Sequence, residues 1–545
     1  MEQVAHWSTP LADAARMRAL DAYAIERAGI PGIELMESAG TAVARAAEEL
    51  AGGGAVVVLA GKGNNGGDGF VAARLLAQAG LAVSVYCTAA RDDYAGDAAS
   101  ALGRLGEVPL VERCCADEEA CRDTASALGG AAVIIDALLG TGAAGAPRGE
   151  LARAIGLVNA SQAPVLSVDI PSGVDASSGE VPGTAISARR TVTFHMAKVG
   201  LLVAPGKWHA GAVSVAPIGI PGEAWRETAG AAGRGAVTGR GGASPTVALI
   251  DERAIALLPL RGVRSTKFTS GHVLLVGGSP DLTGAVRLAA GGALRAGAGY
   301  LTACLPAGLR ERFAASAPAE VMSRALAEDG SGHLAAAALP AIEQAARRGG
   351  ALVLGNGIGR EQETGRLVRK LAATLALPLV LDADGLHAYA GEIDALAGRS
   401  APTILTPHAG ALARLLAVEG QRIDSARLAS VRSAAARSGS IVLLKGDDTL
   451  IAAPDGTVLV SPGGAPALAS AGSGDVLAGV IGALLASGAP PLLSAAAGVL
   501  MHLRAGRLAA GEVGVAEAVL ASDVIACLAQ ARAQALAERP AVGGS

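Results

Sequence analysis

Residues 471–479 read AGSGDVLAG and place one carboxylate among glycines, directly before an apolar run. Gly472 and Gly474 allow a backbone to approach a ligand closely, and the apolar run predicts a helix. The free N–H groups and the dipole of a helix N-terminus favour bound anions. Asp475 would then lie beside a phosphate, where it could take a proton from a hydroxyl group. An ordinary N-cap aspartate before a buried helix is the alternative interpretation.

A glycine-rich segment, GKGNNGGDG (61–69), follows an apolar run, AVVVLA (55–60), that is typical of a buried parallel strand. The segment predicts a loop, with a helix over 70–80 after it. It contains a G-x-G-x-x-G match. However, the next predicted strand, 81–87, ends without the acidic residue that a dinucleotide-binding dehydrogenase uses for the ribose. An ordinary Rossmann dehydrogenase is therefore not favoured.

Three successive loops of this half carry amide, hydroxyl or carboxylate side chains directly after a predicted strand: Asn64, Asn65, Asp68, Asp136, Asp169 and Ser172. The carboxyl ends of parallel strands lie along one edge of an open α/β sheet, where ligands bind. Amide side chains beside glycine N–H groups suit a phosphate or a ribose. The three loops therefore predict one binding site, whereas a well-capped turn is the alternative for the first loop.

The 545 residues are 51% hydrophobic and only 2% aromatic, with a net charge of −4. This length predicts more than one domain, and the charge does not favour nucleic acid as a partner. The six cysteines form no CxxC pair, so reduced thiols are expected. The run 476–503 contains Gly488, Pro490 and Pro491, so two buried helices are predicted there in place of a membrane span.

Residues 226–244 are rich in Gly and Ala without aliphatic periodicity, and they predict a linker between two domains, 1–225 and 245–535. The second half again alternates buried strands with helical patterns. Its predicted strands end in glycine or polar residues: 272–279, 300–306, 351–360, 378–386, 402–410 and 440–450. Both domains are therefore expected to be doubly wound α/β folds.

The motifs GKGNNGGDGFVAARLL, DALLGTG, SVDIPSGVD and TVTFHMAKVGLLVAPG resemble the NAD(P)H-hydrate epimerase family over about residues 10–225. The resemblance implies a Rossmann-like domain that binds the hydrated dinucleotide through two loops: Asn64, Asn65, Gly66, Gly67, Asp68, Gly140, Thr141, Gly142, Ala143, Ala144, Gly145 and Ala146. It implies that Asp169 faces the nicotinamide as an acid/base. It also implies a potassium ion coordinated by Asn65, Asp136 and Ser172. Ser38 stands where the family usually has Asn.

In the second half, FTSGHVLLVGGS, GAVRLAAGGALRAGAGYLT, LDADGL, LTPH, LLKGDDTLI and AGSGDVLAG resemble the ADP/ATP-dependent NAD(P)H-hydrate dehydratase family, over about residues 250–530. The resemblance implies a ribokinase-like domain in which Asp475 is the base. Substrate contacts would come from Ala285, Gly357, His408 and Asp475. Nucleotide contacts would come from Lys445, Gly446, Asp447, Asp448, Thr449, Gly472 and Gly474. Ala411 replaces a usual Glu, whereas Asp382 and Asp384 are unaffected.

The two resemblances together imply an enzyme that repairs hydrated NADH or NADPH. One half would interconvert the R and S epimers. The other would phosphorylate the ring hydroxyl of the S form with ADP or ATP, so that phosphate can leave, with Mg²⁺ on the nucleotide phosphates. Only small molecules are expected as ligands, without nucleic acid or membrane, in a cytoplasmic homo-oligomer. A ribokinase-type small-molecule kinase joined to a non-catalytic nucleotide-binding module is the alternative.

Overall fold

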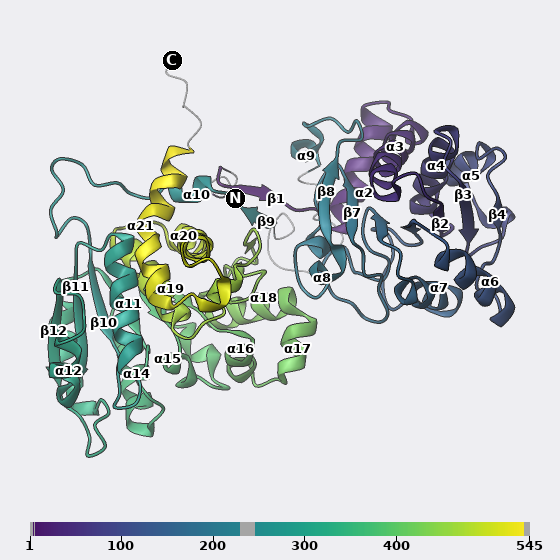
Figure 1. Ribbon diagram of the computed structural model, residues 1–545. Helices are drawn as coiled ribbons and strands as arrows, with labels where there is room; N and C mark the ends of the chain where they lie inside the picture. The colour runs from purple at the N-terminus through teal and green to yellow at the C-terminus, as the bar shows by residue number, and fades with distance from the viewer. Residues whose placement is uncertain (1–3, 5, 229–245, 539–545) are drawn as a thin grey trace. The chain divides into compact units, whose positions relative to one another are not determined.

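The computed structural model describes residues 4, 6–228 and 246–538 (Figure 1). It forms two compact units, an N-terminal unit of residues 11–244 and a C-terminal unit of residues 1–10 and 245–545. The first ten residues thus differ from the predicted domain division. Strand β1 (Ser8–Pro10) pairs antiparallel with β9 (Val247–Ile250), and Trp7 is buried in the core of the C-terminal unit.

Most of the predicted linker, 226–244, lies outside the described residues. Its first two residues form the end of helix α9 (Ala224–Glu227).

The N-terminal unit is built on a parallel sheet of seven strands in its described part, in the order β4-β3-β2-β5-β6-β7-β8. The strands are β2 (Val56–Ala60), β3 (Val83–Cys87), β4 (Leu110–Val111), β5 (Val133–Ala137), β6 (Val165–Val168), β7 (Arg190–Phe194) and β8 (Ala212–Ala216). Successive strands are added toward one edge of the sheet from β2 to β4 and toward the other edge from β5 to β8. The boundary between β2 and β5 is therefore a topological switch point of the Rossmann type, where ligands bind. The predicted doubly wound α/β fold is confirmed for this unit.

Alternate residues of each central strand enter different cores. Val56 and Val58 of β2 pack with the helices on one face of the sheet, whereas Val57 and Leu59 pack with those on the other. The first face is covered by α2 (Ala14–Ala22), α3 (Gly32–Ala51), α4 (Asn64–Gln78) and α5 (Gly96–Gly103). The second face is covered by α6 (Glu118–Gly129) and α7 (Gly149–Ala160) (Figure 1). Because both faces are buried, the central strand β2 is apolar throughout, and β5 is apolar except for Asp136.

The predicted loop 61–69 is a loop only as far as Gly63, because helix α4 begins at Asn64. Its glycines make close packing possible. A Cβ at Gly66 would overlap the carbonyl oxygen of Gly61, and one at Gly69 would lie 2.7 Å from the Ala137 Cβ. The glycines therefore bring α4 against the ends of β2 and β5, and they carry the polar residues of this segment on a helix.

The C-terminal unit contains an eleven-stranded sheet among its described residues, in the order β1-β9-β18-β17-β16-β15-β14-β13-β10-β11-β12. The strands after β9 are β10 (His272–Val276), β11 (Tyr300–Pro306), β12 (Val321–Leu326), β13 (Ala351–Leu354), β14 (Leu379–Leu381), β15 (Thr403–Leu405), β16 (Ile441–Leu444), β17 (Leu450–Ala452) and β18 (Val458–Val460). The run from β16 to β12 is parallel, whereas β17 is antiparallel to both neighbours. The α/β prediction is confirmed here as well.

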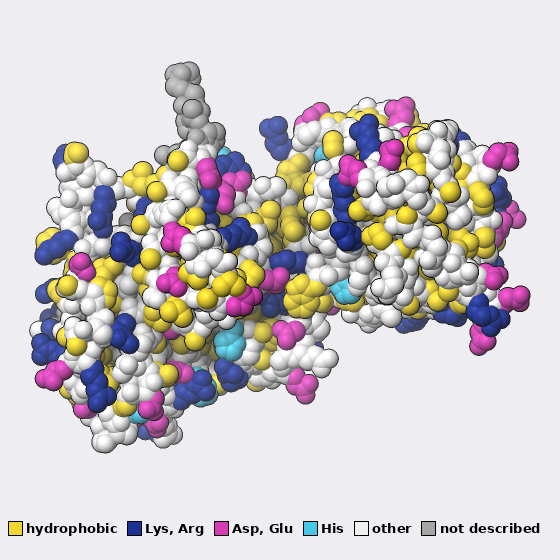
Figure 2. Space-filling model, viewed as in Figure 1, with side chains coloured by type: hydrophobic (Ala, Val, Ile, Leu, Met, Phe, Trp, Pro, Cys, Tyr) yellow, Lys and Arg dark blue, Asp and Glu magenta, His cyan; other side chains and the backbone are white. Residues whose placement is uncertain are grey.

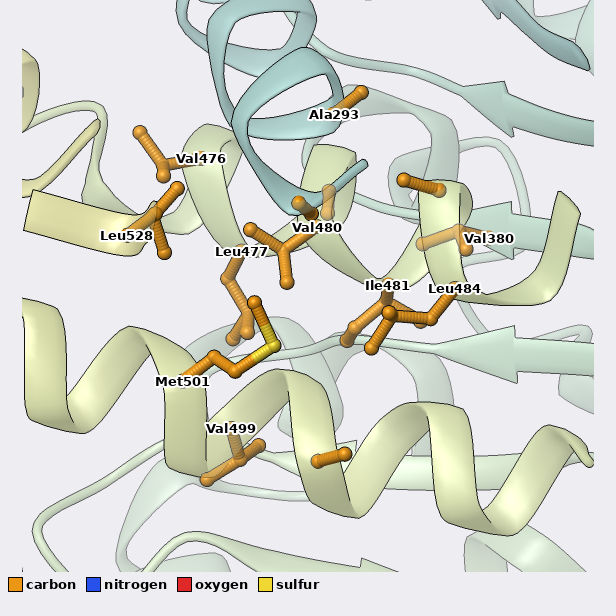
Figure 3. Packing of buried hydrophobic residues seen from close by; sticks show 14 of the residues in the cluster. Ala293, Val380, Val476, Leu477, Val480, Ile481, Leu484, Val499, Met501 and Leu528 are labelled. Carbon is orange, nitrogen blue, oxygen red and sulfur yellow. The ribbon is translucent and has the colours of Figure 1, made fainter. Parts of the chain in front are cut away.

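The helices of this unit are α10 (Arg253–Ala256), α11 (Thr283–Ala296), α12 (Arg310–Ala314), α13 (Leu339–Ala346), α14 (Gln362–Thr374), α15 (Asp384–His387), α16 (Ala409–Leu416), α17 (Gly420–Ser425), α18 (Arg427–Ser438), α19 (Ser473–Ala486), α20 (Pro491–Val513) and α21 (Ala521–Ala537). The run 476–503 forms two helices, α19 and α20, as predicted. Figure 3 shows Leu477 and Ile481 of α19 with Val499 and Met501 of α20 in one buried cluster.

Figure 2 shows acidic and basic side chains interspersed on the visible surfaces. Within the described part of the chain, no helix has the length and apolar character that a membrane crossing requires.

Helices α11 and α19 pack through small residues, which makes their contact sensitive to single methyl groups. A Cβ at Gly479 would overlap the carbonyl oxygen of Ala289. We expect Gly479→Ala to lower the free energy of unfolding of the C-terminal unit by about 1–3 kcal/mol, because overpacking must move a backbone. Calorimetry of the full chain measures this change. The control Gly511→Ala on α20, which has open space, should stabilise it by about 0.5–1 kcal/mol. Equal midpoints for both variants would contradict the packing argument.

Candidate active sites

Asp136, at the end of β5, holds together two loops at the switch point of the N-terminal sheet. It has no exposed surface and accepts hydrogen bonds from Ser167 Oγ (2.8 Å), Ser172 N (2.9 Å) and Ser172 Oγ (2.6 Å). Burial raises the pKa of Asp136, and the hydrogen bonds from Ser172 oppose that rise. The carboxylate therefore fixes the loop after β6 against the end of β5.

The three residues predicted to coordinate potassium are linked by hydrogen bonds, Asn65 and Ser172 through Leu139 and Asp136 through Ser172. Asn65 Nδ2 donates to the Leu139 carbonyl oxygen (3.0 Å), while Leu139 N donates to Ser172 Oγ (2.9 Å), and Ser172 in turn bonds to Asp136. The structure thus joins the Asn65 amide, the Ser172 hydroxyl, the Asp136 carboxylate and the Leu139 carbonyl in one hydrogen-bonded group, and oxygens of these kinds are ligands that hard cations prefer. Gly140 begins the adjoining loop next to Asn65, and the rest of that loop, through Ala146, is half-buried or exposed.

Asp169 follows β6 with a left-handed backbone, at φ 65°, and its side chain is an ion-pair partner of Lys198 (2.6 Å). Thr193 Oγ1 (3.0 Å) and Phe194 N (3.3 Å) donate to the same oxygen, Oδ1. Lys198 has no exposed surface. Sequence reasoning missed this lysine, although it lies within the TVTFHMAKVG motif, because one lysine among apolar residues does not reveal its partner.

Two further acids lie in the electrostatic range of this ion pair, Asp68 on α4 and Asp21 on α2. Burial, and then the charge of Asp169, raises the pKa of Asp68 well above its ordinary value. Burial raises the pKa of Asp21 to about 6, with Lys198 opposing and Asp169 adding to the shift. Asp68 was among the predicted residues, whereas Asp21 was not, because its helix has no motif that points to a site.

In the C-terminal unit, the AGSGD segment forms the N-terminus of α19, as predicted. Gly472 is the N-cap with a left-handed φ of 86°, and Asp475 lies in the first turn. Lys445 Nζ lies next to this turn, 3.1 Å from the position of a Cβ at Gly474. The N–H groups of the helix start and one ammonium group thus surround the same space, which suits an anion.

Asn356 connects Asp475 to a second acid. Its Nδ2 donates to Asp475 Oδ1 (2.8 Å) and to Asp382 Oδ2 (3.2 Å). Asp382 Oδ1 accepts from Thr406 Oγ1 (2.7 Å) and Lys445 Nζ (3.0 Å). These residues follow β13, β14, β15 and β16, at the carboxyl ends where an α/β sheet binds ligands. Asn356 and Thr406 were not predicted, although each stands in a segment whose neighbours were.

The pKa of Asp475 is raised to about 6, mainly because the carboxyl group is buried. The charges of Asp382 and Asp384 raise it further, whereas Asn356 and Lys445 lower it. Such a group is largely ionised at pH 7 and yet accepts a proton more readily than an ordinary aspartate.

The other predicted residues of this unit lie around the same strand ends. A Cβ at Gly357 would lie 2.9 Å from the Ala285 Cβ, so these two residues adjoin each other. His408 is exposed at the start of α16, and burial followed by the charge of Lys445 lowers its pKa. Thr449 Oγ1 donates to the Gly446 carbonyl oxygen (2.7 Å) and closes the turn after β16. In this turn Gly446 and Asp447 are exposed, whereas Asp448 forms a buried ion pair with Arg427 (2.7 Å).

Comparisons with known proteins match both units. A family model described as NAD(P)H-hydrate dehydratase matches residues 273–529, and one described as YjeF-related protein N-terminus matches residues 32–200. The chain is 37% identical over 456 residues to the bifunctional NAD(P)H-hydrate repair enzyme Nnr of Salinibacter ruber, with 82% of each chain covered. The enzyme of the same name from Moorella thermoacetica gives the same identity and coverage. A solved structure of ADP/ATP-dependent NAD(P)H-hydrate dehydratase from Bacillus subtilis, co-crystallised with ATP and Mg²⁺, is 27% identical with a TM-score of 0.44 and covers 52% of this chain and 96% of that one.

The hydrogen bonds of Ser172 make its contribution measurable without any ligand. We expect Ser172→Ala to lower the free energy of unfolding of the N-terminal unit by about 1.5–3 kcal/mol, because a buried carboxylate loses a donor. The control Ser38→Ala removes an exposed hydroxyl from α3 and should change stability by less than about 0.5 kcal/mol. Calorimetry distinguishes the two, and equal effects would show that the Asp136 network does not stabilise this unit.

Proposed function

The chain belongs to the family of bifunctional NAD(P)H-hydrate repair enzymes, and from this premise we propose how its two units divide the reaction. The N-terminal unit interconverts the R and S epimers of hydrated NADH or NADPH. The C-terminal unit dehydrates the S form with ADP or ATP and releases AMP or ADP with phosphate. The likeness to bifunctional relatives over 82% of the chain supports this function over a small-molecule kinase. A cytoplasmic homo-oligomer stays a prediction.

The observation that carries the dehydratase assignment is the place of Asp475, in the first turn of α19 beside Lys445 and Asn356. A phosphoryl group at this helix start would receive N–H groups from the Gly472–Gly474 segment, which stabilise charge as it develops. Asp475 would take the proton of the ring hydroxyl as that oxygen attacks phosphorus. Lys445 would hold the nucleotide phosphates, together with the turn Gly446–Thr449, while Ala285, Gly357 and His408 would contact the hydrated dinucleotide.

Magnesium would enter this site on the nucleotide phosphates. Asp382 and Asp384 already have protein partners, Thr406, Lys445 and Asn356 for the first and Arg360 (2.7 Å) for the second. This arrangement suits a cation that keeps several waters and takes other ligands from phosphate. The ion would neutralise charge on the transferring phosphoryl group.

In the epimerase unit, the loops that carry Asn64–Asp68 and Gly140–Ala146 would bind the dinucleotide. A potassium ion held by Asn65, Asp136 and Ser172 would supply positive charge for its phosphates. The hydrogen bonds that link these three residues through Leu139 and Ser172 support this assignment. Asp169 would face the hydrated nicotinamide ring and act there as an acid/base.

Replacing the proposed base tests the dehydratase site. We expect Asp475→Asn to lower dehydration at least about a hundredfold without unfolding the unit, because the amide cannot accept the proton. The recovery of reduced-nicotinamide absorbance, with and without ADP or ATP, measures the rate. The matched control is Asp523→Asn, which changes an acid in the first turn of α21 and should keep normal turnover. Wild-type turnover in Asp475→Asn would exclude this residue as the base.

The pH dependence gives a second test of the same carboxyl group. Since the base must be ionised, kcat/KM should fall about tenfold per pH unit below the pKa of Asp475, which lies at about 6. Asn356→Leu removes a hydrogen bond that lowers this pKa, so the fall should begin at higher pH. An acid limb that stays in place in Asn356→Leu would show that another group titrates.

The epimerase assignment predicts incomplete conversion when Asp169 is lost. A phosphoryl-transfer site aligns one hydroxyl configuration, because reactive geometry tolerates errors of only about an ångström. In a short assay, Asp169→Ala should convert a mixed hydrate only part-way and leave one epimer, as chromatography can show. Addition of the Asp475→Asn chain, whose epimerase unit is intact, should restore completion. Equally fast use of both epimers by Asp169→Ala would rule out epimerisation through Asp169.

A further inference from the structure

A cavity of about 1000 Å³ lies in the C-terminal unit, at the amino ends of strands of its sheet. Its lining comes from the segment before β10, the last turn of α11, the first residues of β11 and β12, and α21. Arg348 of this lining precedes β13, whereas Asn356, which bonds to Asp475, follows the same strand. Four residues of a strand span about 13 Å, so the cavity and the candidate dehydratase site are separate places.

The charged side chains that line the cavity are mostly cationic. They are Arg261, Lys267, Arg295 and Arg348, with Glu320 as the acid among them. Arg261 is fixed in place, because its Nη2 donates to two carbonyl oxygens just after α11 (2.8 and 3.1 Å). Within the described residues, Lys267, Arg295 and Arg348 form no ion pair with a carboxylate. Cations gathered without acidic partners repel one another, so an anion that they share would lower the free energy.

An aromatic ring is exposed in the same cavity. The other three phenylalanines of the chain are buried, whereas Phe268 is 67% exposed. Its ring meets the edge of Tyr300, with 5.7 Å between the centroids, and Tyr300 stacks on the buried His272 at 4.4 Å. Lys267 Nζ lies 5.2 Å from the centroid of the Phe268 ring. A ring held in this way beside cations offers a planar group a surface on which to stack.

The segment between α10 and β10 (Figure 1) places the ring and the cation before any ligand arrives. A Cβ at Gly299 would lie 2.0 Å from the Lys267 carbonyl oxygen, so only a glycine lets this segment lie against the start of β11. The segment is also closed on itself, since Ser270 Oγ donates to the Thr266 carbonyl oxygen (2.9 Å). Such preorganisation lowers the cost of ordering side chains on binding.

We propose that this cavity binds a nucleotide with two or more phosphates, its base against Phe268 and its phosphates on Lys267, Arg295 and Arg348. Guanidinium groups suit phosphate, because their paired donors match its oxygens. Four cations and one acid give the lining a net charge of +3, which a single phosphate group of about −2 would not neutralise. The volume is that of a small-molecule site. The proposal goes beyond the function proposed above and does not depend on it.

Hydrogen exchange of the full-length chain, followed by mass spectrometry, tests this site apart from the dehydratase site. The chain is titrated with ADP in the absence of hydrated dinucleotide. We expect ADP to protect residues 261–270 as well as residues 445–449, each with its own midpoint. Arg348→Glu should weaken the affinity measured at 261–270 at least about tenfold, because a phosphate ligand meets an anion in place of a cation. Protection at 445–449 should not change, which shows that the variant is folded.

The matched control is Arg347→Glu, which reverses the charge of the neighbouring exposed arginine outside the lining and should keep both midpoints. Protection of 445–449 by ADP without protection of 261–270 would overturn the proposal. An Arg348→Glu chain with wild-type affinity at 261–270 would overturn it as well.

Two further variants test the class of ligand. Phe268→Ala should weaken ADP binding at 261–270 about fivefold or more, and it should leave inorganic pyrophosphate binding unchanged, because only the base loses its stacking partner. Glu320→Gln should strengthen the binding of both ligands, since it removes a repelling charge. Pyrophosphate that binds the wild-type chain at 261–270 as tightly as ADP would overturn the assignment of a nucleotide.

Discussion

A buried carboxylate beside a single lysine is the interaction on which both sites depend. Lys198 pairs with Asp169 in one unit, and Lys445 pairs with Asp382 in the other. A buried ion pair yields little net stability by itself, because desolvation opposes the Coulombic attraction. Its effect is local, since one cation cannot neutralise the further acids nearby. Burial raises the pKa values of Asp68 and Asp475, and a second carboxylate adds to each rise, Asp169 for the first and Asp382 for the second.

The small residues of the chain make these placements possible. Helix α4 can lie against the ends of β2 and β5 only because Gly66, which faces Gly61, and Gly69, which faces Ala137, have no side chain. Helix α19 depends on Gly479 in the same way, through its contact with α11. A chain with 75 glycines and few aromatic residues builds its cores from close backbone approach. Core packing and the geometry of the candidate sites are therefore set by the same glycines, so a methyl group added to the core can displace the helix that carries Asp475.

Much of this organisation could be predicted from sequence, because apolar strands followed by glycine or acidic residues are local signals. The AGSGD helix start, the two α/β folds and the division of 476–503 into two helices depend on such signals and were correctly predicted. The start of α4 at Asn64 was missed, since its glycines suggest a loop until the facing strands are known. Asp21, Lys198, Asn356 and Thr406 were missed for a related reason. Each of them interacts mainly with partners that lie between 24 and 177 residues away in the sequence, and Lys198 also bonds to Thr193, 5 residues away across a turn. A single sequence does not show such pairs.

Burial raises the pKa of one carboxyl group at the strand ends of each unit, Asp68 in the N-terminal unit and Asp475 in the C-terminal unit. On the function proposed above, the C-terminal unit would need Asp475 ionised, a condition that fails as the pH falls through about 6. Because complete repair of a mixed hydrate would need both units, it would stop in that range even where epimerisation continues.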